Sequence, residues 1–256
     1  MRRAFAGCLL GAVVSAHAQV IDEVPFITSP DNVTLEMLRL ADVGPGDHVI
    51  DLGSGDGRIV ILAARRFGAT GLGVEIDPRL VRESQKNARE AGVADRVQFR
   101  EQDLFHTDLS RASVVTMYLL PEVNLQLRPS VLALRPGTRI VSHDWDMGDW
   151  KPDVTTIVPV PDKQVGLEKS SRVHLWVVPA RVEGLWCGQA GPLRLVQRHQ
   201  EVEVRTETGA PTTGRLHGHV LHLDAEVAGA RRFELAGDAL RAGAAAPLLR
   251  ARDSRC

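Results

Sequence analysis

One stretch of the chain decides the fold: residues 51–58 read DLGSGDGR. It follows a short apolar run, His48–Leu52, and precedes Arg58–Phe67, where apolar residues recur at helical spacing. Glycines between a strand and a helix let the main chain turn sharply and bring a ligand against bare backbone. The stretch therefore predicts a ligand-binding loop after the first strand of an α/β fold.

The residues downstream keep alternating between short apolar runs and amphipathic runs. This alternation predicts right-handed βαβ units around a buried parallel sheet. The expected strands are 71–76, 97–101, 113–119 and 138–142, and the expected helices are 78–91 and 122–134. No helix separates the last two runs, 155–160 and 172–178, which favours an antiparallel pair at one edge. The fold class is therefore α/β, with a doubly wound, mostly parallel seven-stranded sheet.

The residue patterns before and after this region differ from it. Upstream, Ser29 and Pro30 have the residue types of a helix N-cap and first position, and predict a helix to about Ala41. Downstream of Pro179, short alternating runs between turn residues predict a small antiparallel β module of roughly seventy residues. The tail after Arg241, rich in Ala and Gly, is expected to be loosely held.

The first eighteen residues, MRRAFAGCLLGAVVSAHA, predict a secretory signal peptide. They combine an arginine pair, a short apolar run and an A-x-A site at residues 16–18. The predicted organisation is a signal peptide at 1–18, an α/β domain at 19–180 and a β-rich module at 181–256. We expect an exported, periplasmic protein, or one tethered to the membrane if the leader stays uncleaved.

Composition excludes several classes of protein. The chain has 256 residues, 44% of them hydrophobic, and a formal net charge of −1, so it has no net positive field with which to bind nucleic acid. No apolar stretch is long enough to span a bilayer as a helix. The absence of a Cys-x-x-Cys pair or a Cys/His cluster argues against a metal site. Cys187 and Cys256 could pair after export, but because Cys256 is the last residue we expect two free thiols.

Two further acids stand at strand ends. Glu75 ends the second predicted strand and Asp103 follows the third. A carboxylate at the tip of the second strand accepts the ribose hydroxyls of an adenosine-bearing ligand, and one after the third strand can accept from the adenine amine. Within the loop, Asp51 and Asp56 would repel a pyrophosphate but suit the ammonium and sulfonium of S-adenosylmethionine. An NAD-dependent enzyme is disfavoured, because Arg58 occupies the place of the third glycine in its G-x-G-x-x-G loop.

These motifs together resemble those of class I S-adenosylmethionine-dependent methyltransferases, which have a Rossmann-like fold, over about residues 24–179. More narrowly, VPFITSP at 24–30 and DLGSGDGRIV at 51–60 resemble the ATP synthase c-subunit lysine N-methyltransferase family and its bacterial relatives. The chain departs from that family after the fourth strand, where 118–124 reads YLLPEVN. The resemblance implies that S-adenosyl-L-methionine is bound at its methionine end by Asp51, Gly53 and Gly55, at its ribose by Glu75 and at its adenine by Asp103.

Methyl transfer from a sulfonium needs alignment and exclusion of water more than acid–base chemistry. A lysine acceptor must nevertheless be neutral when it attacks, which calls for a group that receives its proton. The polar residues expected after the fourth and fifth strands are Tyr118, Glu122, Asn124, His143, Asp144 and Asp146, and of these Tyr118 and Asp144 are the catalytic candidates. Neighbours on a strand point to opposite faces, so His143 and Asp144 are not expected to form a triad or metal site. Pro25, Phe26 and Thr28 are expected to form a lid.

The sequence therefore predicts an S-adenosylmethionine-dependent methyltransferase that N-methylates an amine, in a protein lysine or in a small molecule. The alternative is a non-catalytic binding or assembly protein of the cell envelope that retains the fold. In either case the C-terminal module could contact an envelope partner. Loss of S-adenosylmethionine binding on replacement of Glu75 would separate the two hypotheses.

Overall fold

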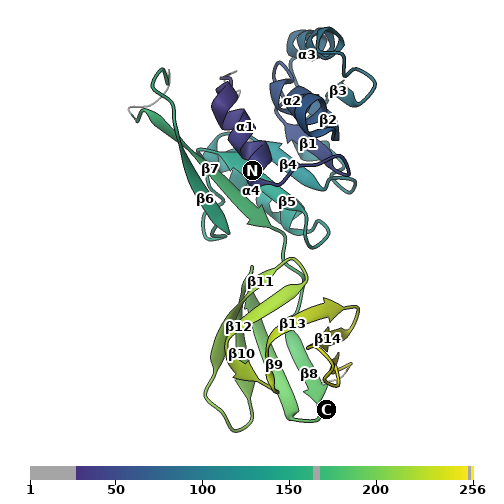
Figure 1. The fold of residues 1–256 in the computed structure, drawn as a ribbon, viewed down its shortest axis with the longest axis vertical. Coiled ribbons are helices and arrows are strands. Elements are labelled where there is room, and N and C mark those ends of the chain that lie inside the picture. Colours follow the sequence, from purple (N-terminus) through teal and green to yellow (C-terminus); the bar gives the residue numbers. More distant parts are fainter. Residues whose placement is uncertain (1–26, 164–167, 253–254) are drawn as a thin grey trace, which may run out of the picture.

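The computed structural model describes residues 27–163, 168–252 and 255–256, and it contains an α/β domain followed by a β-barrel (Figure 1). The predicted leader, residues 1–18, lies outside the described residues. The helices are α1 Asp31–Leu40, α2 Arg58–Phe67, α3 Pro78–Glu90 and α4 Pro121–Leu132, with a 3₁₀ turn η1 at Leu104–His106. The strands of the first domain are β1 His48–Leu52, β2 Thr70–Glu75, β3 Val97–Glu101, β4 Val114–Met117, β5 Arg139–His143, β6 Val154–Pro159 and β7 Ser170–Val177.

The sheet has the order β3-β2-β1-β4-β5-β7-β6, which confirms the predicted seven-stranded α/β class. Strands β1 to β5 pair in parallel, and β7 runs antiparallel to both β5 and β6. Both faces of the central strands are covered. Ile50 and Leu52 share a core cluster with Val123 and Leu127 of α4, whereas Val49 shares the other main cluster with residues of α1 and α2. Burial on both faces explains why these strands read as continuous apolar runs.

One local prediction upstream of the sheet is wrong. Ser29 does not cap α1: Pro30 occupies the cap position, and no side chain there bonds to the helix. The Ser29 hydroxyl instead lies 2.8 Å from Nδ1 of His143, 114 residues away. A buried tertiary hydrogen bond has therefore replaced the local one that the sequence favoured.

Gly57 offers a test of the loop packing. Its φ of 82° is left-handed, and a Cβ there would lie 2.7 Å from ring atoms of Phe99 on β3. Gly57→Ala is therefore expected to destabilise the protein by about 3 kcal/mol, roughly 1 from the backbone conformation and about 2 from overpacking. Gly92→Ala is the matched control, since Gly92 has a φ of 70° but open space around its Cβ position. Urea unfolding of both variants measures the difference, and equal losses would contradict the packing account.

The C-terminal module is a closed antiparallel barrel, which confirms the predicted β class. Its strands are β8 Gly184–Gly188, β9 Gly191–Arg198, β10 Glu201–Thr206, β11 Thr212–His217, β12 Val220–Val227, β13 Ala230–Ala236, β14 Ala239–Arg241 and β15 Leu248–Arg250. Trp186, Leu195 and Leu216 are among its fully buried side chains. The expectation of a loosely held tail is wrong, because β15 pairs with both β14 and β8 and so closes the barrel. Three strand residues were too few to stand out in the sequence.

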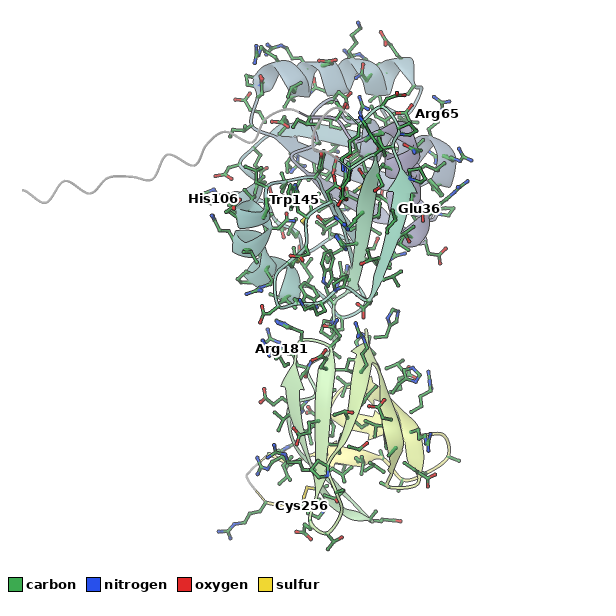
Figure 2. All side chains as sticks on the ribbon, turned by 90° about the vertical axis from the view of Figure 1, so that its left-hand side faces the viewer. Glu36, Arg65, His106, Trp145, Arg181 and Cys256 are labelled. Carbon is green, nitrogen blue, oxygen red and sulfur yellow. A yellow bond between two sulfur atoms is a disulfide. The ribbon has the colours of Figure 1, made fainter. Side chains whose placement is uncertain are left out.

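The expectation of two free thiols is also wrong. Cys187 on β8 and Cys256 form a disulfide, with their Cα atoms 5.4 Å apart. Because β15 pairs with β8, the end of the chain lies close to Cys187. This closeness allows Cys256 to form the disulfide although it is the terminal residue. Figure 2 shows Cys256 at the end of the barrel distal to the first domain, and Arg181 at the junction.

The barrel meets the first domain at the edge of the sheet opposite the carboxyl ends of its parallel strands. Gly218 of the barrel lies against Gly137, which precedes β5. Asp149, in the segment between β5 and β6, pairs with Arg128 of α4 and with Arg198 of the barrel. In the part of the chain that the structure describes, no helix is long and apolar enough to cross a membrane.

Candidate functional site

A cavity of about 570 Å³ opens at the carboxyl ends of the parallel strands. Its walls come from the loop after β1, the end of β2, the turn after β3, the end of β4 and residues 27–29. It is lined by all five predicted cofactor-binding residues and by Tyr118: Asp51, Gly53, Gly55, Glu75, Asp103 and Tyr118. Asp144, the other catalytic candidate, does not line it. The fold thus brings together side chains from four strand ends at one hollow.

Glu75 organises the loop beside it. Its Oε2 accepts a hydrogen bond from the Gly55 amide at 3.0 Å. Its Oε1 accepts from the amides of Ile76 and Asp77, at 2.8 and 3.1 Å. Gly53 and Gly55 both have left-handed φ, 72° and 52°, which the sharp turn after β1 requires. One carboxylate therefore joins the glycine loop to the end of the next strand and keeps both in place around the cavity.

Asp51 is the buried acid of the site, with 2% of its surface exposed. Its Oδ1 accepts a hydrogen bond from the Thr116 hydroxyl at 2.7 Å. Burial raises the pKa of Asp51 to about 7, the Thr116 bond opposes the rise, and the charges of Glu75 and Asp56 add to it. A cation bound in the cavity would favour the ionised form, so this carboxylate is suited to a positively charged ligand.

The part of the cavity after β2 and β3 combines apolar side chains with a further acid, Asp103. Ile76 and Phe105 line it although they are 59% and 38% exposed. Asp103 stands beside them, with Oδ1 accepting from the Phe105 amide and Oδ2 lying 3.0 Å from Nδ1 of His106. Exposed apolar side chains next to a carboxylate fit a flat base with an exocyclic amine. The Ser54 hydroxyl, buried in the cavity wall, has no hydrogen-bond partner among the described residues, which fits a polar ligand group there.

Residues before α1 close one side of the cavity. Ile27, Thr28 and Ser29 belong to its lining. Arg58 donates to the main-chain oxygen of Ser29 at 3.0 Å, and its guanidinium pairs with Asp56 at 2.7 Å. Arg58 therefore anchors this segment. In the sequence, its position served only as an argument against a dinucleotide-binding loop. Of the predicted lid residues, Thr28 lies at the cavity, whereas Pro25 and Phe26 lie outside the described residues.

Only one of the polar candidates after β4 and β5 lines the cavity, and that is Tyr118. Its ring stacks on His143 with centroids 3.9 Å apart. Burial raises the pKa of Tyr118, and the charge of Asp144 raises it further, so the phenol is neutral. Glu122 and Asp146 are exposed. Asn124 is buried and donates to the Ser142 hydroxyl, which gives it a structural role.

The expectation that His143 and Asp144 point apart is wrong. Asp144 has a φ of 62°, so the alternation of a strand ends at His143. The Asp144 carboxylate turns back to 3.5 Å from Nε2 of His143 and accepts from Lys163 Nζ at 2.8 Å. Ser171 on β7 also reaches His143, at 2.9 Å from Nε2. Sequence reasoning missed Lys163 and Ser171, and no local signal could have found them. Ser171 reaches the site because β7 pairs with β5, and Lys163 because it follows β6, which pairs with β7.

Comparison with known proteins places the chain among methyltransferases. The model of a family described as ANTKMT methyltransferase domain matches residues 51–154. A protein-lysine N-methyltransferase of Saccharolobus islandicus is 38% identical over 160 residues, covering 62% of this chain and 96% of that protein. The mouse ATP synthase c-subunit lysine N-methyltransferase is 33% identical, and the match spans 52% of this chain and 53% of that protein.

A solved structure supports the same relationship. The crystal structure of an RNA methyltransferase from Salinibacter ruber in complex with S-adenosyl-L-homocysteine has a TM-score of 0.55 and 54% sequence identity. The match covers 61% of this chain and 96% of that one. The family model ends at residue 154, before the barrel begins.

Proposed function

The chain belongs to the S-adenosylmethionine-dependent methyltransferases related to protein-lysine N-methyltransferases, and on that premise we propose that its methyl acceptor is the ε-amine of a lysine in a protein. The similarity to the archaeal enzyme over 96% of that enzyme's length carries the proposal. The position of Tyr118 supports it, since an aromatic side chain beside the carboxylate-lined cavity can shape a narrow channel for an amine.

We propose the following roles for the cavity residues toward S-adenosylmethionine. Glu75 accepts from the ribose hydroxyls and Asp103 from the adenine amine, with Ile76 and Phe105 against the base. Asp51 faces the charged methionine end together with the glycine loop. The apolar walls, the unpartnered Ser54 hydroxyl and the buried carboxylate fit these groups. The cofactor supplies a methyl group on a sulfonium, which is already reactive toward a neutral amine.

The protein itself must supply the other requirements of methyl transfer. It must hold the amine in line with the methyl group, exclude water and remove the ammonium proton. Tyr118 is placed to do the first, since it lies at the cavity and is supported from behind by the His143 ring. Asp144 lies outside the cavity lining, so any part it takes in proton removal is indirect.

We also propose that the protein is exported and that the barrel contacts a partner in the cell envelope. The composition of residues 1–18 supports export. The disulfide between Cys187 and Cys256 is of the kind that persists in oxidising compartments. Amino-terminal sequencing of the protein from a periplasmic fraction should begin at Gln19, and a chain recovered in the cytosol with residues 1–18 intact would contradict export.

The acceptor is tested by mass spectrometry of envelope proteins from strains with and without the gene. We expect lysine side chains heavier by the mass of one CH₂ group, or a multiple of it, in the strain that carries the gene. A strain carrying the Glu75→Ala variant is the control and should match the deletion. Methylation confined to RNA, as the description of the Salinibacter structure would suggest, or to side chains other than lysine, would contradict the proposal.

A further inference from the structure

A continuous chain of hydrogen bonds leads away from the cavity wall. The Ser29 hydroxyl, at the wall, lies 2.8 Å from Nδ1 of His143. Nε2 of the same ring lies 2.9 Å from the Ser171 hydroxyl, which lies 3.4 Å from Oδ2 of Asp144. Lys163 donates to that same Oδ2 at 2.8 Å. Ser29, His143 and Ser171 are each at most 3% exposed, so water does not compete for these bonds.

The direction of each bond in this chain follows from its acidic end. Burial acts to raise the pKa of Asp144, but the bonds from Lys163 and the Arg172 amide outweigh it, and the pKa lies below its ordinary value. An ionised carboxylate only accepts, so the Ser171 hydroxyl donates its single proton to Asp144. Ser171 must then accept from His143, which places the ring proton on Nε2.

The position of the ring proton on Nε2 determines whether the Ser29 hydroxyl acts as a donor or an acceptor toward the cavity. Burial lowers the pKa of His143 to about 4, Asp144 opposes the shift and Lys163 reinforces it, so the imidazole is neutral and carries one N–H. Its Nδ1 is therefore an acceptor, and the Ser29 hydroxyl donates to it. The lone pairs of Ser29 Oγ are left as acceptors. The other groups against this unit are the neutral Tyr118 ring on His143 and Arg58, which donates to the main-chain oxygen of Ser29 and pairs with Asp56.

We propose that Ser29 takes the proton of the acceptor ammonium and that His143 relays it through Ser171 to Asp144. The inference rests on the proposed lysine acceptor. An N–H bond of the ammonium breaks as an O–H bond forms on Ser29, whose own proton passes to Nδ1 of His143. The Nε2 proton passes to Ser171, and the Ser171 proton to Oδ2 of Asp144. Both serines end as hydroxyls and the imidazole ends neutral, as the other tautomer, so one positive charge has left the cavity.

The far end of the relay can release the proton. The lowered pKa of Asp144 makes its protonated form short-lived, and its side chain is 15% exposed, so the proton passes to water. Asp144 thus receives the proton without touching the substrate. A carboxylate outside the cavity lining can therefore still take part in proton removal. Within the relay, His143, Ser171 and Asp144 are positioning residues, and Ser29 is the member that meets the acceptor.

Rate profiles test the relay, with poly-L-lysine as the acceptor probe and tritiated S-adenosylmethionine as the donor. For the wild-type protein and each variant, kcat is measured at saturation from about pH 7 to about pH 10. Ser29→Ala and His143→Gln should lower kcat at about pH 7 by roughly 100-fold, and the deficit should shrink as the pH approaches about 10, because a lysine that is already neutral needs no relay. His48→Gln is the control, since His48 bonds a threonine hydroxyl at the opposite end of the sheet and should keep the wild-type profile.

A second measurement does not depend on turnover. Long-range ¹⁵N–¹H correlation spectra of histidine-labelled wild-type protein should show His143 neutral and protonated at Nε2. Protonation at Nδ1 instead, or variants whose kcat profiles run parallel to the wild type, would overturn the relay. A wild-type protein that binds S-adenosylmethionine yet methylates neither poly-L-lysine nor any cellular lysine would refute the lysine acceptor. In that case the His143 tautomer would establish only the direction of these hydrogen bonds.

Discussion

Replacing Glu75 with alanine is expected to weaken S-adenosylmethionine binding by at least about 100-fold, or roughly 3 kcal/mol. The variant removes the acceptor of three main-chain amides, those of Gly55, Ile76 and Asp77, as well as the proposed acceptor of the ribose hydroxyls. Hydrogen bonds to a charged acceptor contribute about 1.5–3 kcal/mol each, and unpaired amides add a cost to the empty protein. Titration calorimetry with S-adenosylmethionine measures the loss directly.

A matched control separates this effect from a general loss of acidic charge. Glu101 ends the neighbouring strand in register with Glu75, is exposed and does not line the cavity. Glu101→Ala should therefore bind the cofactor as the wild type does. Circular dichroism should show both variants folded. Wild-type affinity in a folded Glu75→Ala protein would show that the cavity binds its ligand in some other way.

Replacing Asp51 with asparagine is expected to change both the affinity for S-adenosylmethionine and its pH dependence. The wild-type carboxylate has a pKa of about 7, so below that pH it is mostly protonated and must ionise when a cation binds. Wild-type affinity should therefore fall by up to tenfold per unit as the pH drops below about 7. Asp51→Asn should bind weakly with no such slope, and calorimetry from about pH 5 to about pH 8 records both. A wild-type slope retained in the variant would contradict this role for Asp51.

The same substitution should stabilise the empty protein. The pKa of Asp51 is raised in the folded state, from 3.8 to about 7, so the unfolded chain holds fewer protons between these values. Stability from this group is present at low pH and is lost as the pH rises through that window, a loss of up to about 4 kcal/mol. Thermal unfolding should show Asp51→Asn more stable than the wild type near pH 8, with the difference vanishing near pH 4. A wild type that is the more stable at about pH 8 would contradict the raised pKa.

The elements around the cofactor cavity could be predicted because their signals are local. The boundaries of β1, β3 and α2 agree with the sequence prediction at both ends. Buried parallel strands read as apolar runs, and glycines such as Gly53 end them where the backbone must turn. The chain order of strands and helices then places Glu75 and Asp103 at one edge of the sheet, since carboxyl ends of parallel strands share an edge.

The acceptor side of the site could not be predicted in the same way. Ser29 was expected to cap a helix, and its true partner, His143, is 114 residues away. The left-handed backbone of Asp144 reversed the direction expected for its side chain. Ser171 arrives through an antiparallel pairing whose register no local pattern encodes. The closure of the barrel and its disulfide belong to the same class of non-local contacts.

Local patterns in the amino-acid sequence were sufficient to specify the α/β sheet, the glycine turn and the acids that line the cavity. These depend on hydrophobic periodicity and backbone freedom within a few residues. The polar groups that meet behind the cavity, and the closure of the barrel, depend on contacts between segments far apart in the chain. Buried hydrogen bonds among distant residues form only when packed strands bring them within about 3 Å, and that distance is a property of the whole fold.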